Sequence, residues 1–140
     1  MILSFAVSEI EAKRKKEKFE KAEIRSTPFL TRIKKTKVLF PKEMNVLRIE
    51  FEFLTEYRPN IGFIKIKGFV LYSSDKIDEI LEFLGSKKIL PPEVEIEIKN
   101  FLFRKCLTLG IQISENMQLP PPLAFPSLIR KKEKKLDYIG

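Results

Sequence analysis

The chain has 140 residues, a formal net charge of +8, 44% hydrophobic residues, 12 phenylalanines, one cysteine and no histidine. This length and this apolar content are enough for one domain with a proper core. Without histidine the chain lacks the commonest general base and zinc ligand, and it has no glycine-rich phosphate loop, so we expect no enzyme, no cofactor and no metal.

The N-terminal segment, MILSFAVSEIEAKRKK, places apolar residues before charged ones, which is the reverse of a signal peptide. No apolar run approaches the ~18 residues that span a bilayer. The single cysteine, Cys106, provides no disulfide framework, and we interpret it as a small buried core thiol. We therefore expect a soluble, cytoplasmic protein without membrane insertion.

Residues 2–10 alternate well enough to predict a first strand. Residues 11–25 are mostly charged; they could continue that strand or form a solvated helix, and we favour a long charged hairpin or loop. Positive charge gathers in two segments. Residues 13–42 carry 12 Lys and Arg against three Glu, and residues 130–135 carry five against one.

A second strand is predicted over residues 29–40, with a bulge near Lys34 and Lys35 where the alternation slips. Residues 44–57 give the clearest strand, with apolar residues on one side and Arg48, Glu50 and Glu52 on the other. This pattern is typical of an antiparallel sheet with one buried and one wet face.

A turn at residues 58–60 leads into a fourth strand over residues 61–74, so the third and fourth strands are expected to be antiparallel neighbours. One face of the fourth strand carries Ile64, Ile66, Val70 and Tyr72. The opposite face carries Phe63, Lys65, Lys67, Phe69 and Leu71.

Two helices follow. Asp75 is expected to cap a short helix over residues 77–84, and Gly85 to end it. A long helix is expected from the proline pair at residues 91–92 to Asn116.

The long helix is apolar on two sides. One side carries Val94, Ile98, Phe101, Leu102, Leu109 and Ile113. The other carries Ile96, Phe103, Leu107 and Ile111. Because an ordinary surface helix needs one apolar stripe, we expect a second copy of the chain to cover the second side.

Pro120, Pro121 and Pro122 predict an extended polyproline segment after the long helix, along which Leu119, Leu123 and Phe125 can lie on a surface. We expect one α+β domain over residues 1–128, with a four-stranded antiparallel sheet on which the short and the long helix pack, and a basic C-terminal tail over residues 129–140.

This order of elements resembles the SecB-type export chaperone family, in its divergent, archaeal-like form. The resemblance covers residues 45–126, through VLRIEFEFLTEYRPNIGFIKIKGFVLY, NFLFRKCLTLGIQ and LPPPLAF. It implies a homo-oligomer, a dimer or a tetramer built as a dimer of dimers, with the long helices in the subunit interfaces. It also implies binding of unfolded polypeptides without nucleotide and their delivery, typically to an export motor. Familiar bacterial members are strongly acidic, whereas this chain is +8, so holdase activity is a safer inference than motor docking.

A holdase needs exposed apolar surface with charged rims. The candidates for peptide binding are Phe63, Phe69, Leu71, Leu119, Leu123 and Phe125, although each could instead close the core. The candidates for the oligomer interface are Ile96, Phe103, Leu107 and Ile111.

A small RNA-binding or ribosome-associated protein is the alternative from another class. The basic stretch of residues 13–42 is interleaved with Phe19, Phe29 and Phe40, which offers phosphate contacts and base stacking. No recognised RNA-binding motif accompanies it. A non-catalytic adaptor is the third hypothesis.

Overall fold

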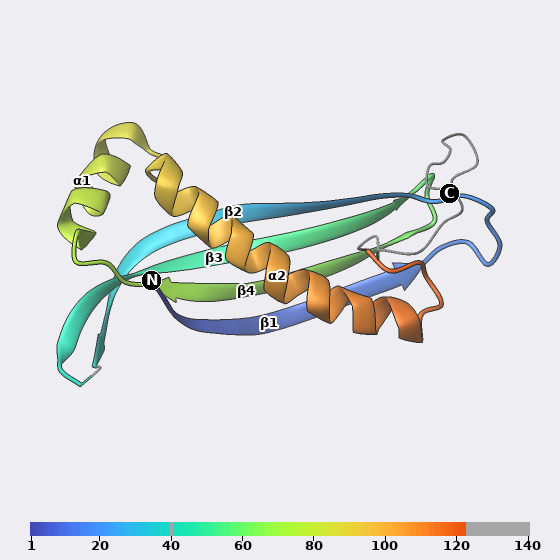
Figure 1. The fold of residues 1–140 in the computed structure, drawn as a ribbon, viewed down its shortest axis with the longest axis horizontal. Coiled ribbons are helices and arrows are strands. Elements are labelled where there is room, and N and C mark those ends of the chain that lie inside the picture. Colours follow the sequence, from blue (N-terminus) through green and yellow to red (C-terminus); the bar gives the residue numbers. More distant parts are fainter. Residues whose placement is uncertain (40, 123–140) are drawn as a thin grey trace, which may run out of the picture.

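The computed structural model describes residues 1–39 and 41–122. The elements in this part of the chain are β1 (Ile2–Arg14), β2 (Glu23–Leu39), β3 (Glu43–Arg58), β4 (Gly62–Tyr72), α1 (Ile77–Lys87) and α2 (Pro92–Asn116). The strands form one antiparallel sheet in the order β1-β4-β3-β2. The long α2 crosses one face of the sheet diagonally, and α1 lies at one end of it (Figure 1). The predicted α+β fold is confirmed.

The charged segment after the first strand is not a hairpin, because β1 and β2 lie at opposite edges of the sheet. The first strand continues to Arg14, which pairs with Gly62 on β4. The guanidinium of Arg14 donates hydrogen bonds to the main-chain carbonyls of Met117, Gln118 and Glu17. Its carbon centre lies 5.2 Å from the centroid of the Phe19 ring. The link between β1 and β2 is therefore fixed to the chain that leaves α2.

The bulge in β2 lies at Thr31 and not near Lys34 and Lys35. Leu30 faces Phe51 and Arg32 faces Glu50, which leaves Thr31 as the extra residue. As a result, Leu30 and Ile33 both pack against the core, although they are three positions apart. Phe29 is 44% exposed.

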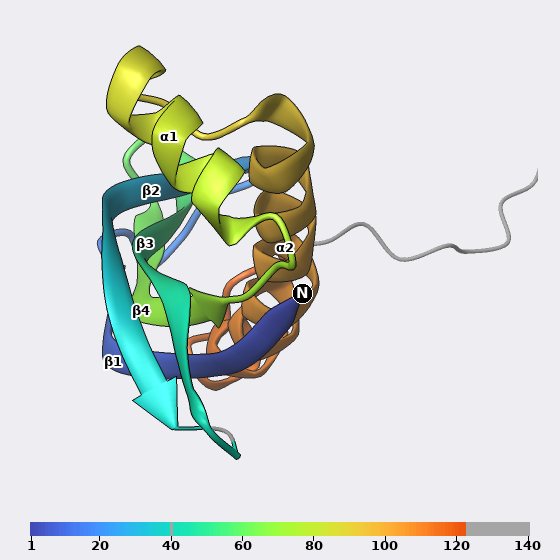
Figure 2. The same ribbon diagram turned by 90° about the vertical axis from the view of Figure 1, so that its left-hand side faces the viewer.

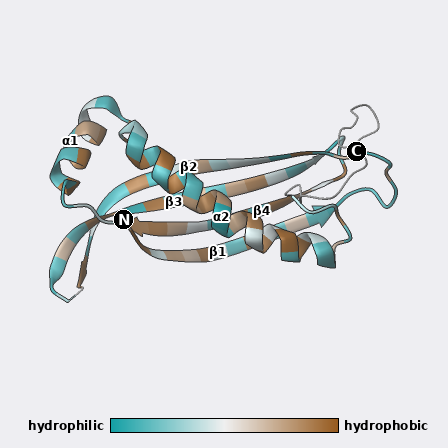
Figure 3. Ribbon diagram, viewed as in Figure 1, coloured by the Kyte–Doolittle hydropathy of each residue, from teal (hydrophilic) through white to brown (hydrophobic). Residues whose placement is uncertain are grey.

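The core lies between α2 and the inner face of the two central strands, where apolar residues alternate with polar ones along each strand (Figure 3). The register pairs Phe53 with Ile66 and Ile49 with Val70. From α2, a row with a spacing of four residues is buried: Val94, Ile98, Leu102, Cys106, Gly110 and Ser114.

Residues from both predicted apolar sides of α2 pack against the core of the chain. Phe101 meets Phe5 on β1 edge-on at 5.6 Å, and Phe103 meets Phe53 on β3 edge-on at 5.5 Å. These contacts broaden a single packed face of α2 within its own chain.

Two glycines allow β1 to approach β4 closely. A Cβ atom at Gly68 would lie 2.0 Å from the carbonyl oxygen of Ala6, and one at Gly62 would lie 2.3 Å from that of Lys13. Both neighbours are main-chain atoms, which a side chain cannot displace cheaply.

The predicted limits of the short helix are corrected. The N-cap position is Lys76 and not Asp75, and no side chain caps the helix; the N–H of Lys76 itself donates a hydrogen bond to Ser74 Oγ at 3.1 Å. The helix runs through Gly85 to Lys87. The helix ends at Lys88, which takes a left-handed conformation with φ 64° and donates its N–H to the Leu84 carbonyl at 2.8 Å.

Candidate functional site

The face of the sheet opposite α2, here called the outer face, is the candidate site. Seen along the strands, α2 covers one side of the sheet, and the described part of the chain leaves the other side uncovered (Figure 2). The residues of β3 and β4 that point to this side alternate with the core residues and are half-buried.

Ion pairs run across the middle of the outer face. Lys65 Nζ lies 3.9 Å from Glu11 Oε1 on β1, and Lys67 Nζ lies 3.9 Å from Glu52 Oε1 on β3. Exposed pairs of this length contribute little to stability, on the order of 0–1 kcal/mol each. They form a charged belt that can open without a large loss of free energy.

On one side of the belt, Phe69 and Leu71 lie beside Arg48. The Arg48 guanidinium carbon is 3.7 Å from the centroid of the Phe69 ring, and Arg48 Nε is 3.7 Å from Glu50 Oε2. A hollow of about 340 Å³ borders the ring, with Ser8 and Thr31 among its lining residues. The stacked guanidinium shields the ring from water while leaving its rim accessible.

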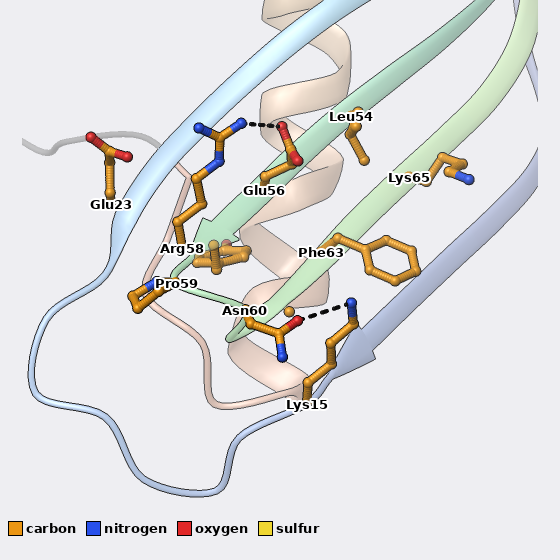
Figure 4. A pocket seen from close by; sticks show the side chains of 11 residues that line it. Lys15, Glu23, Leu54, Glu56, Arg58, Pro59, Asn60, Phe63 and Lys65 are labelled. Atoms are coloured by element: carbon orange, nitrogen blue, oxygen red, sulfur yellow. Dashed lines mark hydrogen bonds and ion pairs between the residues drawn. The ribbon is translucent and has the colours of Figure 1, made fainter.

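On the other side of the belt, Phe63 lies in a hollow of about 710 Å³ at the turn between β3 and β4. Lys15 Nζ and Lys65 Nζ are 5.6 and 5.8 Å from the centroid of its ring. Lys15 Nζ also donates a hydrogen bond to Asn60 Oδ1 at 3.4 Å, and Figure 4 shows this contact beside the ring. The hollow therefore has an aromatic wall with ammonium groups at its rim.

Of the predicted peptide-binding residues, Phe63, Phe69 and Leu71 share the outer face. Leu119 belongs to the core, at 5% exposed, and is therefore not part of an accessible surface. Leu123, Phe125 and the tail of residues 129–140 lie outside the described residues.

Sequence reasoning missed two apolar residues of this surface. Leu54 lines the larger hollow with Phe63, and its place in the alternation of β3, two residues after Glu52, could have identified it. Phe29 on β2 pairs with Glu52 of the outer face and is 44% exposed, whereas the sequence had indicated it only as a base-stacking residue of the basic stretch.

The predicted oligomer residues divide into two groups. Phe103 and Leu107 pack in part against the core of their own chain. Ile96 is 59% exposed, and Ile111 is half-buried. Assembly through this side of α2 stays a prediction, and Ile96 is its most accessible residue.

Burial raises the pKa of the Cys106 thiol to about 12, so little of the reactive thiolate forms at neutral pH. Residues 1–39 and 41–122 contain no group of three His, Cys, Asp or Glu side chains placed to hold a metal ion. Neither helix of this part of the chain is long and apolar enough to span a membrane.

No family model and no curated protein sequence matches the chain. Among solved structures, it is similar to the Mycobacterium tuberculosis Rv1957 SecB-like chaperone in complex with a ChAD peptide from the Rv1956 HigA1 antitoxin. The two chains are 12% identical and superpose with a TM-score of 0.46, over 94% of this chain and 91% of that one.

Proposed function

We propose that the protein is an ATP-independent holdase that binds unfolded polypeptides on the outer face of its sheet. One observation carries the proposal: Phe63 with Leu54, and Phe69 with Leu71, form two half-buried apolar patches separated by a belt of weak ion pairs. Such a surface binds apolar segments of many sequences, while the charges limit self-association.

The rigidity of the sheet favours this role. Phe63 and Phe69 sit on β4, which is paired on both sides, so the rings are held without a further loss of backbone entropy on binding. An extended client can place apolar side chains in the hollows beside the two rings and leave its polar side chains in water. Recognition then depends on apolar area rather than on a defined sequence.

The proposal extends to assembly and setting. We propose a homo-oligomer, a dimer or tetramer, with Ile96 of α2 in the contact between subunits, acting in the cytoplasm. Delivery of clients to an export motor is the further step that the sequence resemblance implies.

An aggregation assay tests the proposal. The wild type should suppress light scattering by a chemically denatured test protein at near-stoichiometric ratio, with little dependence on salt. The double variant Phe63→Ser/Phe69→Ser should lose most of this effect. The matched control Ile10→Ser removes an apolar side chain that is 49% exposed on β1, at a position facing Ile66, and should protect as the wild type does. Equal protection by the double variant would rule out the outer face as the site.

A specific observation also favours nucleic-acid binding. Lys15 and Lys65 flank the Phe63 ring, and an aromatic ring between ammonium groups suits a stacked base and its phosphates. Binding of labelled single-stranded RNA should then weaken steeply between low and moderate salt, because counterion release drives it. RNA binding of this kind without suppression of aggregation would replace the holdase by this second function.

A further inference from the structure

A second apolar surface lies at the opposite edge of the sheet from β1. Two adjoining hollows, of about 260 and 320 Å³, are lined by residues of β2 and of the corner where α1 leads into α2. Figure 1 shows the position of this corner in the fold. Leu30, Ile33 and Lys88 line both hollows, so the two form one groove. Ile89, which is 56% exposed, stands at its rim.

The groove borders a free strand edge. Within the described residues β2 pairs with β3 alone, so its other edge presents main-chain N–H and C=O groups to any added strand. The bulge at Thr31 turns Leu30 and Ile33 toward the same side, which gives the groove an apolar floor next to that edge. Bulges recur beside functional sites because they redirect side chains in this way.

The charge of the groove is unbalanced. Lys99 is paired with Glu95 at 2.7 Å. Arg32 and Lys88 have no ion-pair partner among the described residues. Both are exposed beside an apolar floor, so carboxylates of a bound segment would complement them.

We infer that this groove binds an extended acidic segment of another polypeptide as an added strand on β2. The segment places an apolar side chain over Leu30 and Ile33, and its flanking Asp or Glu side chains approach Arg32 and Lys88. Main-chain hydrogen bonds supply affinity and the apolar position supplies selectivity. The groove is a second site, separate from the outer face, and the inference names the class of segment that it takes. The chain's own residues 130–135, with five Lys and Arg, carry the wrong charge for the groove.

Peptide binding tests this inference. The probe is a fluorescein-labelled decapeptide of alternating Val and Thr with a central Leu flanked by Glu, and the matched probe has Lys in place of Glu. The wild type should bind the Glu peptide on the order of tenfold more tightly in fluorescence anisotropy, which corresponds to about 1.4 kcal/mol. Two further peptides carry N-methyl groups on the main-chain nitrogens of either the odd or the even positions. One of these two peptides should no longer bind, because alternate N–H groups of an added strand face β2.

A charge-reversed variant provides the decisive comparison. Arg32→Glu/Lys88→Glu changes two exposed side chains and should prefer the Lys peptide, a reversal that misfolding cannot produce. Equal binding of both peptides by the wild type, or an unchanged preference in the variant, would overturn the inference. A solution mass of the variant that differs from that of the wild type would also overturn it, because the edge of β2 would then be a contact with a second copy of the chain.

The outcomes also separate this inference from the proposed function. Suppression of aggregation without a preference for the Glu peptide would overturn the acidic-segment site and leave the holdase standing. Binding of the Glu peptide with the expected reversal, but without suppression of aggregation, would support the groove and remove the holdase.

Discussion

The ring of Phe103 on α2 stands edge-on to the ring of Phe53 on β3, with centroids 5.5 Å apart and planes at 89°. This contact packs one side of a residue that was predicted to face another subunit against the core of its own chain. A test of assembly that replaces Phe103 would therefore confuse loss of an interface with loss of packing. Ile96 avoids this problem, because it lies between the buried Val94 and Ile98 and its own side chain is 59% exposed.

We expect Ile96→Asp to lower the solution mass of the protein, because a carboxylate in an apolar subunit contact would be desolvated without a partner. Multi-angle light scattering measures the mass. The free energy of unfolding of the variant in urea should stay within about 0.5 kcal/mol of that of the wild type when both proteins are in the same oligomeric state. Thr108→Asp, on the exposed side of α2, is the matched control. Phe103→Asp should instead unfold the chain. An unchanged mass for Ile96→Asp would remove this side of α2 as an interface.

Substitution of two glycines by alanine should have opposite effects on the free energy of unfolding. Gly68→Ala forces a methyl group to 2.0 Å from the Ala6 carbonyl oxygen and should destabilise the fold by roughly 3 kcal/mol or more. Gly85→Ala lies inside α1 with nothing within 4 Å of the added atom, and should stabilise by about 0.5–1 kcal/mol. Urea unfolding measures both, and a stable Gly68→Ala protein would contradict the close approach of β1 to β4.

The thiol of Cys106 should be inert in the folded protein. Its side chain is 1% exposed and burial raises its pKa to about 12, so neither thiolate nor access is available to a disulfide reagent such as dithiobis(nitrobenzoate). The reaction, followed by its colour, should proceed at the rate of unfolding, and this rate should rise sharply in urea. Rapid reaction under native conditions would contradict the placement of this residue.

Replacement of Tyr57 by phenylalanine tests a buried hydroxyl. Tyr57 donates a hydrogen bond to the Pro120 carbonyl at 2.7 Å, and its loss should cost about 1 kcal/mol at pH 7. Desolvation by burial raises the pKa of Tyr57 from 10.0 to about 12, against a smaller opposing effect of Ser114.

The same pKa shift sets the sign of an alkaline effect. The unfolded chain releases this proton near pH 10 and the folded chain near pH 12, so stability present below pH 10 is lost as the pH rises to 12. Tyr57→Phe should lose less stability than the wild type over this interval in urea unfolding at pH 9 and 11. Tyr72→Phe is the comparison, because burial and Glu97 raise its pKa in the same direction.

The alternation of residues 44–57 was sufficient to predict the two faces of the sheet, and with them the outer-face positions of Phe63, Phe69 and Leu71. Local pattern was insufficient wherever a distant segment decides the structure. The bulge at Thr31 depends on the partner strand β3, and the crossing from β1 to β2 depends on β4 lying between β1 and β3. Leu119 is buried because the chain folds back after α2, where Tyr57 binds the Pro120 carbonyl.

The position of β1 at the far edge also affects how the chain is made. Val7 lies opposite Gly68, so some sixty residues must be synthesised before the first strand meets its neighbour. Pairings this distant in sequence slow folding, since the intervening loop must close before they form. During translation, therefore, β1 must remain without its partner until β4 has left the ribosome, and only then can the sheet be completed.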